Sequence, residues 1–406
     1  MTASTPNAER HFLHESPDFS LVLGGPLYQL WRRTRLAGGA LQLLSRRVLA
    51  FCLLTWLPLL ILSVVEGNAW GGAGRDVAIP FLLDIETQLR FLVAVPLLIV
   101  AELVVHQRMR PLVQQFVDRG LITEETCPRF DAAIRSAMRL RNSVVAELLL
   151  IATVYVVGVG LIWRTQVALS VVSWYGVGVD NVLRPTLAGW WMGLVSLPLF
   201  QFLLLRWCFR IFIWARFLWQ VSRLRLSLVP THPDRCGGLG VLSSICYAFS
   251  PVLMAQGTLL AGLIANRIFF SGAQLTDFKV EIAGLVALMV LLVLGPLLIF
   301  APQLEAAKRA ALLEYGTFAQ RYAREFDQKW LRGGAPTGEP LLGSADIQSM
   351  ADLSNTFEVV KGMRLAPVNF RAAVQLAITT LLPLLPLTLT MISLEQLLEQ
   401  FLKLLF

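Results

Sequence analysis

The chain has 406 residues, of which 56% are hydrophobic and 15% are charged, and its formal net charge is +8. Soluble domains carry about 25% charged residues, so this composition excludes an ordinary soluble protein and predicts a membrane protein. The basic residues lie in short segments beside apolar runs, which favours sorting of basic loops to the cytoplasm and argues against a nucleic-acid partner.

Six apolar runs between residues 48 and 300 are long enough to cross a bilayer, and they predict an all-α polytopic membrane protein. The predicted spans are Val48–Val65, Leu89–Val105, Ser143–Trp163, Leu187–Leu205, Val241–Ala265 and Ile282–Phe300. A last run, Ala372–Ile392, contains Pro383 and Pro386 and either crosses as a seventh span or re-enters the membrane, with crossing favoured.

The segments between these runs divide the chain. Residues 1–47 are predicted as a cytoplasmic region with an interfacial helix at Ser20–Leu36. Residues 48–302 form the transmembrane domain, and its segments 106–142 and 206–240 are too charged to cross. Residues 303–371 are predicted as a cytoplasmic helical extension, and residues 372–406 as the last membrane segment with a terminal amphipathic helix.

The orientation follows from the charges. With a cytoplasmic N-terminus, 28 of the 35 lysines and arginines fall in cytoplasmic segments, as expected for a bacterial inner-membrane protein. These segments also predict contact with the anionic head groups of the inner leaflet. An aromatic stripe at helical spacing in the 303–371 region predicts a helix contact, either within the chain or in a homo-oligomer; it comprises Tyr315, Phe318, Tyr322, Phe326 and Trp330.

Glu102 and Glu147 are the only acidic residues within the six predicted spans. A buried carboxylate in a membrane costs at least ~2–3 kcal/mol unless it has a partner, water or a proton. The two acids therefore indicate either an ion or proton site at the inner mouth of a path, or interhelical ion pairs. Arg206, Arg210 and His106 are the predicted partners in the second interpretation.

The fifth predicted span is unusually polar. Ser243, Tyr247, Ser250 and Thr258 share one helical face with several small residues, and Pro251 interrupts the helix. Such a stripe can line a water-filled path, or it can let neighbouring helices approach closely. Both interpretations stay open from the sequence.

A loop between the fourth and fifth spans has the sharpest local pattern, with His232, Pro233 and Asp234 followed by Gly237 and Gly238. The glycines could form a nest of backbone N–H groups that binds an anion beside Arg235. The alternative is a tight turn in which Asp234 bonds its own backbone. No cysteine or histidine spacing indicates a metal, and no nucleotide fingerprint or nucleophile–base pair predicts a cofactor or a catalytic residue.

Three segments carry a resemblance: SPDFSLVLGGPL near the start, PTHPDRCGGLG in the middle and DIQSMADLSNTFEVVKGMR near the end. Together they resemble an uncharacterised family of bacterial polytopic inner-membrane proteins with an HPD-x-x-GGLG loop. The resemblance implies one intact membrane protein over the whole chain and transfers no activity.

The leading functional expectation is an oligomeric inner-membrane channel or transporter for a small ion or solute, and so not an enzyme. The alternative is a non-transporting interaction protein, such as a sensor or an envelope assembly factor. A third possibility is an interfacial lipid-modifying enzyme that uses His232 and Asp234. A hydrated cavity across the bilayer would favour transport, and a bundle packed at its centre would favour the interaction protein.

Overall fold

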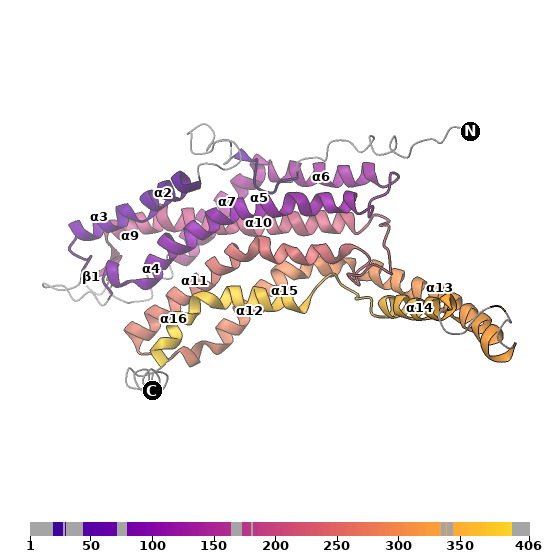
Figure 1. The fold of residues 1–406 in the computed structure, drawn as a ribbon. Coiled ribbons are helices and arrows are strands. Elements are labelled where there is room, and N and C mark those ends of the chain that lie inside the picture. Colours follow the sequence, from indigo (N-terminus) through magenta and orange to yellow (C-terminus); the bar gives the residue numbers. More distant parts are fainter. Residues whose placement is uncertain are drawn as a thin grey trace, which may run out of the picture.

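The computed structural model of the chain describes residues 19–26, 29, 44–70, 79–163, 173–179, 182–333, 338 and 344–391. Helices make up most of this part of the chain (Figure 1). The described strands are β1 (Gly176–Val179) and β2 (Val182–Pro185), which pair antiparallel with Gly176 opposite Pro185. The prediction of an all-α helical protein is therefore confirmed.

Six helical stretches of the described residues are long and apolar enough to cross a membrane. They are Leu44–Val65, Ile85–Asp118, Leu187–Val221, Leu239–Ser271, Leu275–Arg332 and Phe370–Met391. A seventh is counted if the pair α6 (Cys127–Arg141) and α7 (Val144–Thr153), bent by 47°, forms one span. The predicted total of six or seven is confirmed. The last apolar run is one of the six, whereas the predicted third span qualifies only as part of the bent pair.

Most of the long stretches combine α-helices with short 3₁₀ or π-helical segments, whereas α2 and α3 meet at a turn at Trp56. The α-helices, in chain order, are α2 (Leu44–Thr55), α3 (Leu57–Val65), α4 (Ile85–Leu89), α5 (Val95–Asp118), α9 (Leu187–Trp191), α10 (Leu197–Val221), α11 (Ile245–Ser271), α12 (Lys279–Leu294), α13 (Ala301–Asp327), α15 (Phe370–Leu381) and α16 (Leu385–Thr388). Prolines at the start of α3, α5, α10 and α13 suit positions where a helical N–H is not needed.

Helix α11 is the most deeply buried of the six candidate spans and packs against α5, α4 and α15. Two glycines allow this close packing. A Cβ on Gly257 would meet the carbonyl oxygen of Thr380 at 2.0 Å, and a Cβ on Gly262 would meet the Cα of Glu86 at 2.9 Å. Small residues on a buried helix let backbones approach closely in this way.

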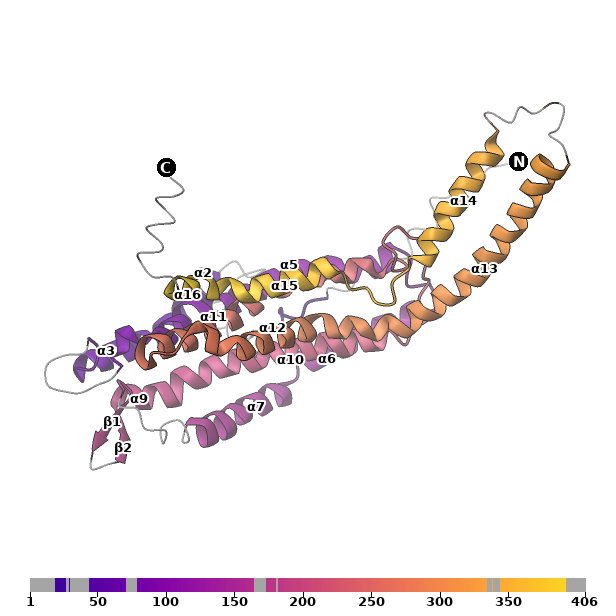
Figure 2. The ribbon, with the colours of Figure 1, turned by 90° about the horizontal axis from the view of Figure 1, so that it is seen from below.

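Helix α13 carries the chain away from the bundle, and α14 (Ala345–Lys361) returns beside it (Figure 2). The two helices form an arm, here named the α13–α14 arm, at the end of the bundle where α5 and α10 finish. Arg216, Arg223 and Arg225 lie at this end, which we name the arginine-rich end.

Candidate functional site

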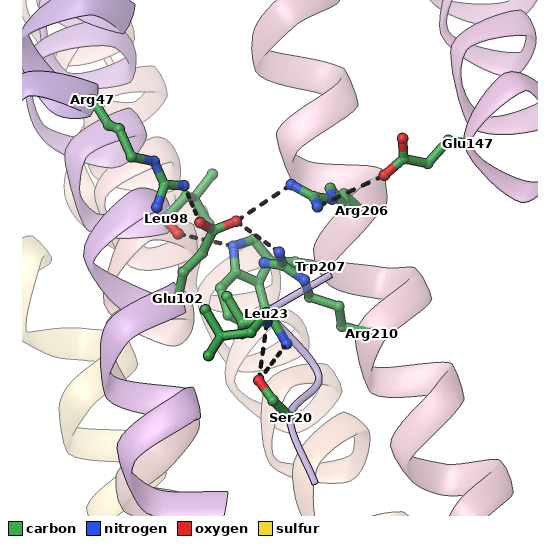
Figure 3. A network of polar contacts seen from close by, with 10 residues as sticks. Ser20, Leu23, Arg47, Leu98, Glu102, Glu147, Arg206, Trp207 and Arg210 are labelled. Atoms are coloured by element: carbon green, nitrogen blue, oxygen red, sulfur yellow. Dashed lines mark hydrogen bonds and ion pairs between the residues drawn. The ribbon is translucent and has the colours of Figure 1, made fainter. Parts of the chain in front are cut away.

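A cluster of buried charges joins α2, α5, α7 and α10 (Figure 3). Arg210 Nη2 donates to Glu102 Oε1 at 2.7 Å, and Arg206 Nη1 lies 3.4 Å from the same oxygen. Arg47 Nη2 donates to the other carboxylate oxygen of Glu102. Arg206 also pairs with Glu147, with 3.7 Å between Nη2 and Oε1. We name these five residues the Glu102 cluster.

The helical repeat explains how α10 supplies two of these arginines. Arg206 and Arg210 are four residues apart, so they lie on the same face of the helix. Trp207, between them, donates from Nε1 to the carbonyl oxygen of Leu98 at 3.0 Å, one turn before Glu102 on α5. The Arg210 guanidinium also lies 4.7 Å from the centroid of the Trp207 ring, a cation–π distance. These contacts fix α10 against α5 at the level of the carboxylate.

Burial makes this cluster energetically demanding. Glu102 is 2% exposed, Arg47 1%, Arg210 3%, Arg206 6% and Glu147 8%. Buried charges persist in proteins when they are paired and hydrogen-bonded, and removing one partner leaves an uncompensated charge. The contacts of both acids are those of the ion-pair interpretation, through Arg206 and Arg210. His106, the third predicted partner, instead lies 2.9 Å through Nδ1 from the hydroxyl of Ser20.

The described part of the N-terminal region packs beside this cluster. Ser20 Oγ accepts from the backbone N–H of Leu23 at 2.9 Å, and the carbonyl of Ser20 accepts from Arg141. Phe19 packs on Phe217 of α10, with 4.9 Å between ring centroids. A Cβ on Gly25, whose φ is +90°, would lie 3.3 Å from Glu147 Oε1. Residues 19–22 are thus buried in the bundle; most of the predicted interfacial helix lies outside the described residues.

The hydroxyls of the predicted permeation stripe bond mainly to the backbone of their own segment. Ser250 Oγ donates to the carbonyl of Cys246 at 2.9 Å, and Thr258 Oγ1 to that of Met254 at 2.8 Å. Ser243 donates to the carbonyl of Gly240 at 2.8 Å. Thr258 is buried beside the packed Gly257, whereas Tyr247 is 46% exposed and stacks against Arg108. The stripe therefore has two parts: the part around Gly257 and Thr258 is packed, and the part around Tyr247 is partly exposed.

The loop that follows α10 is organised around the carboxylate of Asp234. Its Oδ1 accepts from the backbone N–H of Cys236 at 2.7 Å and of Gly238 at 3.2 Å, and its Oδ2 accepts from that of Gly240 at 2.8 Å. His232 Nδ1 lies 3.0 Å from Oδ1. The amides of the predicted anion nest thus already bind an anionic group, which belongs to the chain itself.

The loop takes positive φ at Arg235 (55°), Gly237 (62°) and Gly238 (98°), which two glycines tolerate at low cost. The segment after α14 covers it. Arg364 donates from its backbone N–H to the carbonyl of Arg235 at 2.7 Å and from Nη2 to the carbonyl of Asp234 at 3.1 Å. Two of the three segments that carried the family resemblance therefore meet in space.

The same contacts set the pKa of Asp234. Burial by itself raises the pKa of this carboxyl, but the hydrogen bonds from Cys236, Gly240 and Gly238 outweigh it and lower the pKa below its usual 3.8. A lowered folded-state pKa means that the stabilisation is fully present above about pH 4, the unfolded value, and is lost as the pH falls through the folded-state value.

We expect Asp234→Ala to lower the free energy of unfolding by about 2 kcal/mol at pH 7, because three partly buried amide donors lose their acceptor. Surfactant or denaturant titration of the purified protein would measure it. The exposed Asp118, at the end of α5, supplies the control: Asp118→Ala should stay within about 0.5 kcal/mol of wild type. The difference between wild type and Asp234→Ala should shrink only below pH 4. Equal stability of the two proteins at pH 7 would show that the loop does not depend on this carboxylate.

One buried acid escaped the sequence analysis, because it lies just outside the apolar runs. Asp84, at the start of α4, is 5% exposed and accepts from Trp174 Nε1 and Asn266 Nδ2, both at 2.8 Å. It also accepts from Thr87 Oγ1 at 2.6 Å. These bonds tie α4, α11 and the segment before β1 together at the end of the bundle opposite the α13–α14 arm. An Asp before a Thr three residues later is an N-cap signal that could have identified it.

The fold and the buried cluster define the class: an all-α protein with helices that can span a membrane and are tied together by buried ion pairs. Comparison with protein-family models, curated proteins and solved structures finds no match to this chain.

Proposed function

We propose that this protein is a membrane-anchored docking protein, which lies in the bacterial inner membrane with its N-terminus and arginine-rich end in the cytoplasm. Its α13–α14 arm would bind a cytosolic protein partner. The observation that carries the proposal is the pair of strongly exposed leucines on the α13 side of this arm. Leu313 is 74% and Leu331 73% exposed. Apolar side chains on a helix that enters water favour an interaction surface.

The arm is held together by its own contacts, which gives it a defined surface. Asp346, in the first turn of α14, accepts from Lys329 Nζ at 2.7 Å and from Trp330 Nε1 at 3.0 Å. Its backbone carbonyl accepts from the hydroxyl of Tyr322 at 3.1 Å. Part of the predicted aromatic stripe is thus covered within the chain, while Phe318 remains 45% exposed.

A groove runs along α13, from Leu313 past Thr317 and Arg321 to Gln328. Its charged lining residues are Arg321, Arg324 and Glu325, an excess of one positive charge. An amphipathic helix whose apolar face meets Leu313 and whose flank carries acidic residues fits this surface. We therefore propose an acidic amphipathic helix of a cytosolic protein as the occupant.

The packing of α11 also supports this proposal over transport. Gly257 lies against the backbone of α15, and Thr258 is buried beside it, so this half of the predicted path serves helix packing. Both acids of the Glu102 cluster have arginine partners. A bundle whose helices are joined in this way suits a protein that holds the α13–α14 arm at the membrane.

An oligomeric channel or transporter for a small ion or solute is the second candidate. It is favoured by the half-exposed part of the α11 stripe, where Pro251 cannot donate to the carbonyl of Tyr247 and leaves an acceptor for water or an ion. A homo-oligomer likewise stays a prediction. Saturable flux of an inorganic ion into proteoliposomes, above that of empty liposomes, would favour this candidate.

A photo-crosslinking amino acid at Thr317, in the groove, tests the docking proposal in living cells. We expect an adduct of one defined mass that falls at least fivefold when Leu313→Ser is added, because the apolar contact is lost. Leu365→Ser is the matched control, since Leu365 is 49% exposed but outside the groove, and it should leave the adduct intact. A synthetic peptide of the captured partner's acidic helix should compete with the adduct.

The same probe at Asn355, on an exposed position of α14, should give no such adduct. Equal adducts at both positions would contradict a specific groove. An adduct of twice the mass of the chain would show that the groove binds a second copy of the chain, which would contradict docking of a cytosolic partner.

A further inference from the structure

A second groove, of about 470 Å³, opens between α5 and the turn Leu239–Ser244 that precedes α11. Its walls combine Arg108, Gln107 and Gln115 of α5 with Ser244 and the apolar Val241. Pro111 and Leu112 of α5 also line it, so both walls combine polar and apolar groups. It is separate from the Glu102 cluster and from the α13–α14 arm.

Arg108 supplies a positive charge to this groove. Among the residues that the structure describes, no carboxylate forms an ion pair with it, in contrast to Arg206 and Arg210, which share Glu102. Its guanidinium lies 5.6 Å from the centroid of the Tyr247 ring, which positions the side chain without neutralising its charge. An arginine held in this way is suited to pair with a phosphate.

A hydrogen-bond acceptor lies next to this cation. Pro111 is inside α5 and has no backbone N–H, so it cannot donate to the carbonyl of Gln107, four residues earlier. Both residues line the groove. The groove thus offers a cation and a carbonyl that lacks its helical donor, and these suit a ligand with a phosphate and an N–H or O–H group.

The position along the helices indicates where such a ligand would come from. The apolar stretch Leu89–Val105 of the second span ends just before Gln107 and Arg108. Tyr247, 46% exposed at the same level of α11, is typical of the ring of aromatic residues at a membrane–water boundary. With the membrane boundary just after Val105, the groove would lie at the height of lipid head groups.

We propose that this groove binds the head group of one phospholipid of the bilayer. The phosphodiester would pair with Arg108, and an N–H or O–H group of the head would donate to the Gln107 carbonyl. Phosphatidylethanolamine and phosphatidylglycerol carry such donors, whereas the trimethylammonium of phosphatidylcholine carries none. The site should therefore prefer the first two lipids over the third.

Native mass spectrometry of the full-length protein in detergent, titrated with each of the three lipids, tests the proposal. We expect Arg108→Ala to weaken binding of phosphatidylethanolamine and phosphatidylglycerol about tenfold, as one charge-assisted contact is lost. Arg139→Ala removes an exposed arginine of α6 at the same end of the bundle and should change binding less than twofold.

A second variant tests the carbonyl. Pro111→Ala returns an N–H to α5, which should bond to the Gln107 carbonyl and erase the preference over phosphatidylcholine while phosphate binding remains. Because this change favours the helix, it keeps the test decisive even if Arg108→Ala folds poorly.

Three results would overturn the proposal. They are equal binding by Arg108→Ala and Arg139→Ala, wild-type protein that binds phosphatidylcholine as tightly as the other lipids, and a Pro111→Ala variant that retains the preference. Displacement of bound lipid by 10 mM inorganic phosphate would assign the same chemistry to a soluble phosphate instead.

Discussion

Glu102→Gln is expected to lower the free energy of unfolding by about 3–5 kcal/mol, because it leaves buried guanidinium groups without their carboxylate. Arg47 and Arg210 would lose their ion pairs with Glu102, as would Arg206, whose ion pair with Glu147 would remain. The side chain keeps almost the same volume, so the effect reports charge and not packing. Titration of the folded protein in mild detergent with a denaturing surfactant, followed by tryptophan fluorescence, would measure it.

The chain contains a matched control for this change. Glu305 pairs with Arg309 one turn away on α13, where the two side chains are 46% and 75% exposed. Glu305→Gln should therefore cost less than about 0.5 kcal/mol, as exposed helical pairs do. Adding Arg210→Gln to Glu102→Gln should restore part of the lost stability, since one uncompensated charge is removed.

The outcome also separates the two interpretations of the buried acids. A Glu102→Gln protein as stable as wild type, but with reduced proton or ion flux in proteoliposomes, would contradict a structural ion pair. It would move the ion-site interpretation, and with it the transport candidate, ahead of docking.

The spans could be predicted from the sequence because the thickness of a bilayer sets the length of an apolar helix. The predicted third span shows the limit of this argument. Its apolar length is sufficient, but hydropathy does not show that α6 and α7 meet there at a bend of 47°. Such a bend depends on what the two helices pack against, and local composition carries little of that information.

Glu102 and Glu147 could be named from the sequence, and so could two of their partners, Arg206 and Arg210. The missing partner is Arg47, which the sequence placed in a basic segment before the first span. Its distance from Glu102 depends on how α2 packs against α5, which no local pattern encodes. Asp84 was missed because it lies just outside the apolar runs, and two of its donors, Trp174 and Asn266, come from segments far apart in the chain.

The loop around Asp234 shows how a motif can fit two functions until its atoms are placed. Small residues with positive φ make a nest of N–H groups in either case. Asp234 directs its carboxylate at the amides of Cys236, Gly238 and Gly240. An external anion would have to displace this carboxylate and break its three hydrogen bonds. The contacts therefore favour the tight turn over the anion site.

The second large effect is expected at Gly257. Replacing it with leucine should lower the free energy of unfolding by about 3 kcal/mol or more, because even the first side-chain carbon would meet the Thr380 carbonyl at 2.0 Å and Pro383 Cδ at 3.2 Å. Gly284→Leu on α12 is the matched control, since a Cβ there has no described atom within 4 Å and faces open space. It should leave the stability of the protein within about 1 kcal/mol of wild type.

This pair of variants decides what the packed half of the α11 stripe does. If α11 and α15 are joined through Gly257, the mutant should lose stability and α15 should become accessible to protease at unchanged temperature. A path wall would respond differently, because a side chain that projects into water fills space without displacing a backbone. A stable Gly257→Leu protein with reduced flux would therefore contradict the packing interpretation. If Gly257→Leu loses stability and the wild-type protein shows no flux, a pore is contradicted. Function would then depend on the α13–α14 arm.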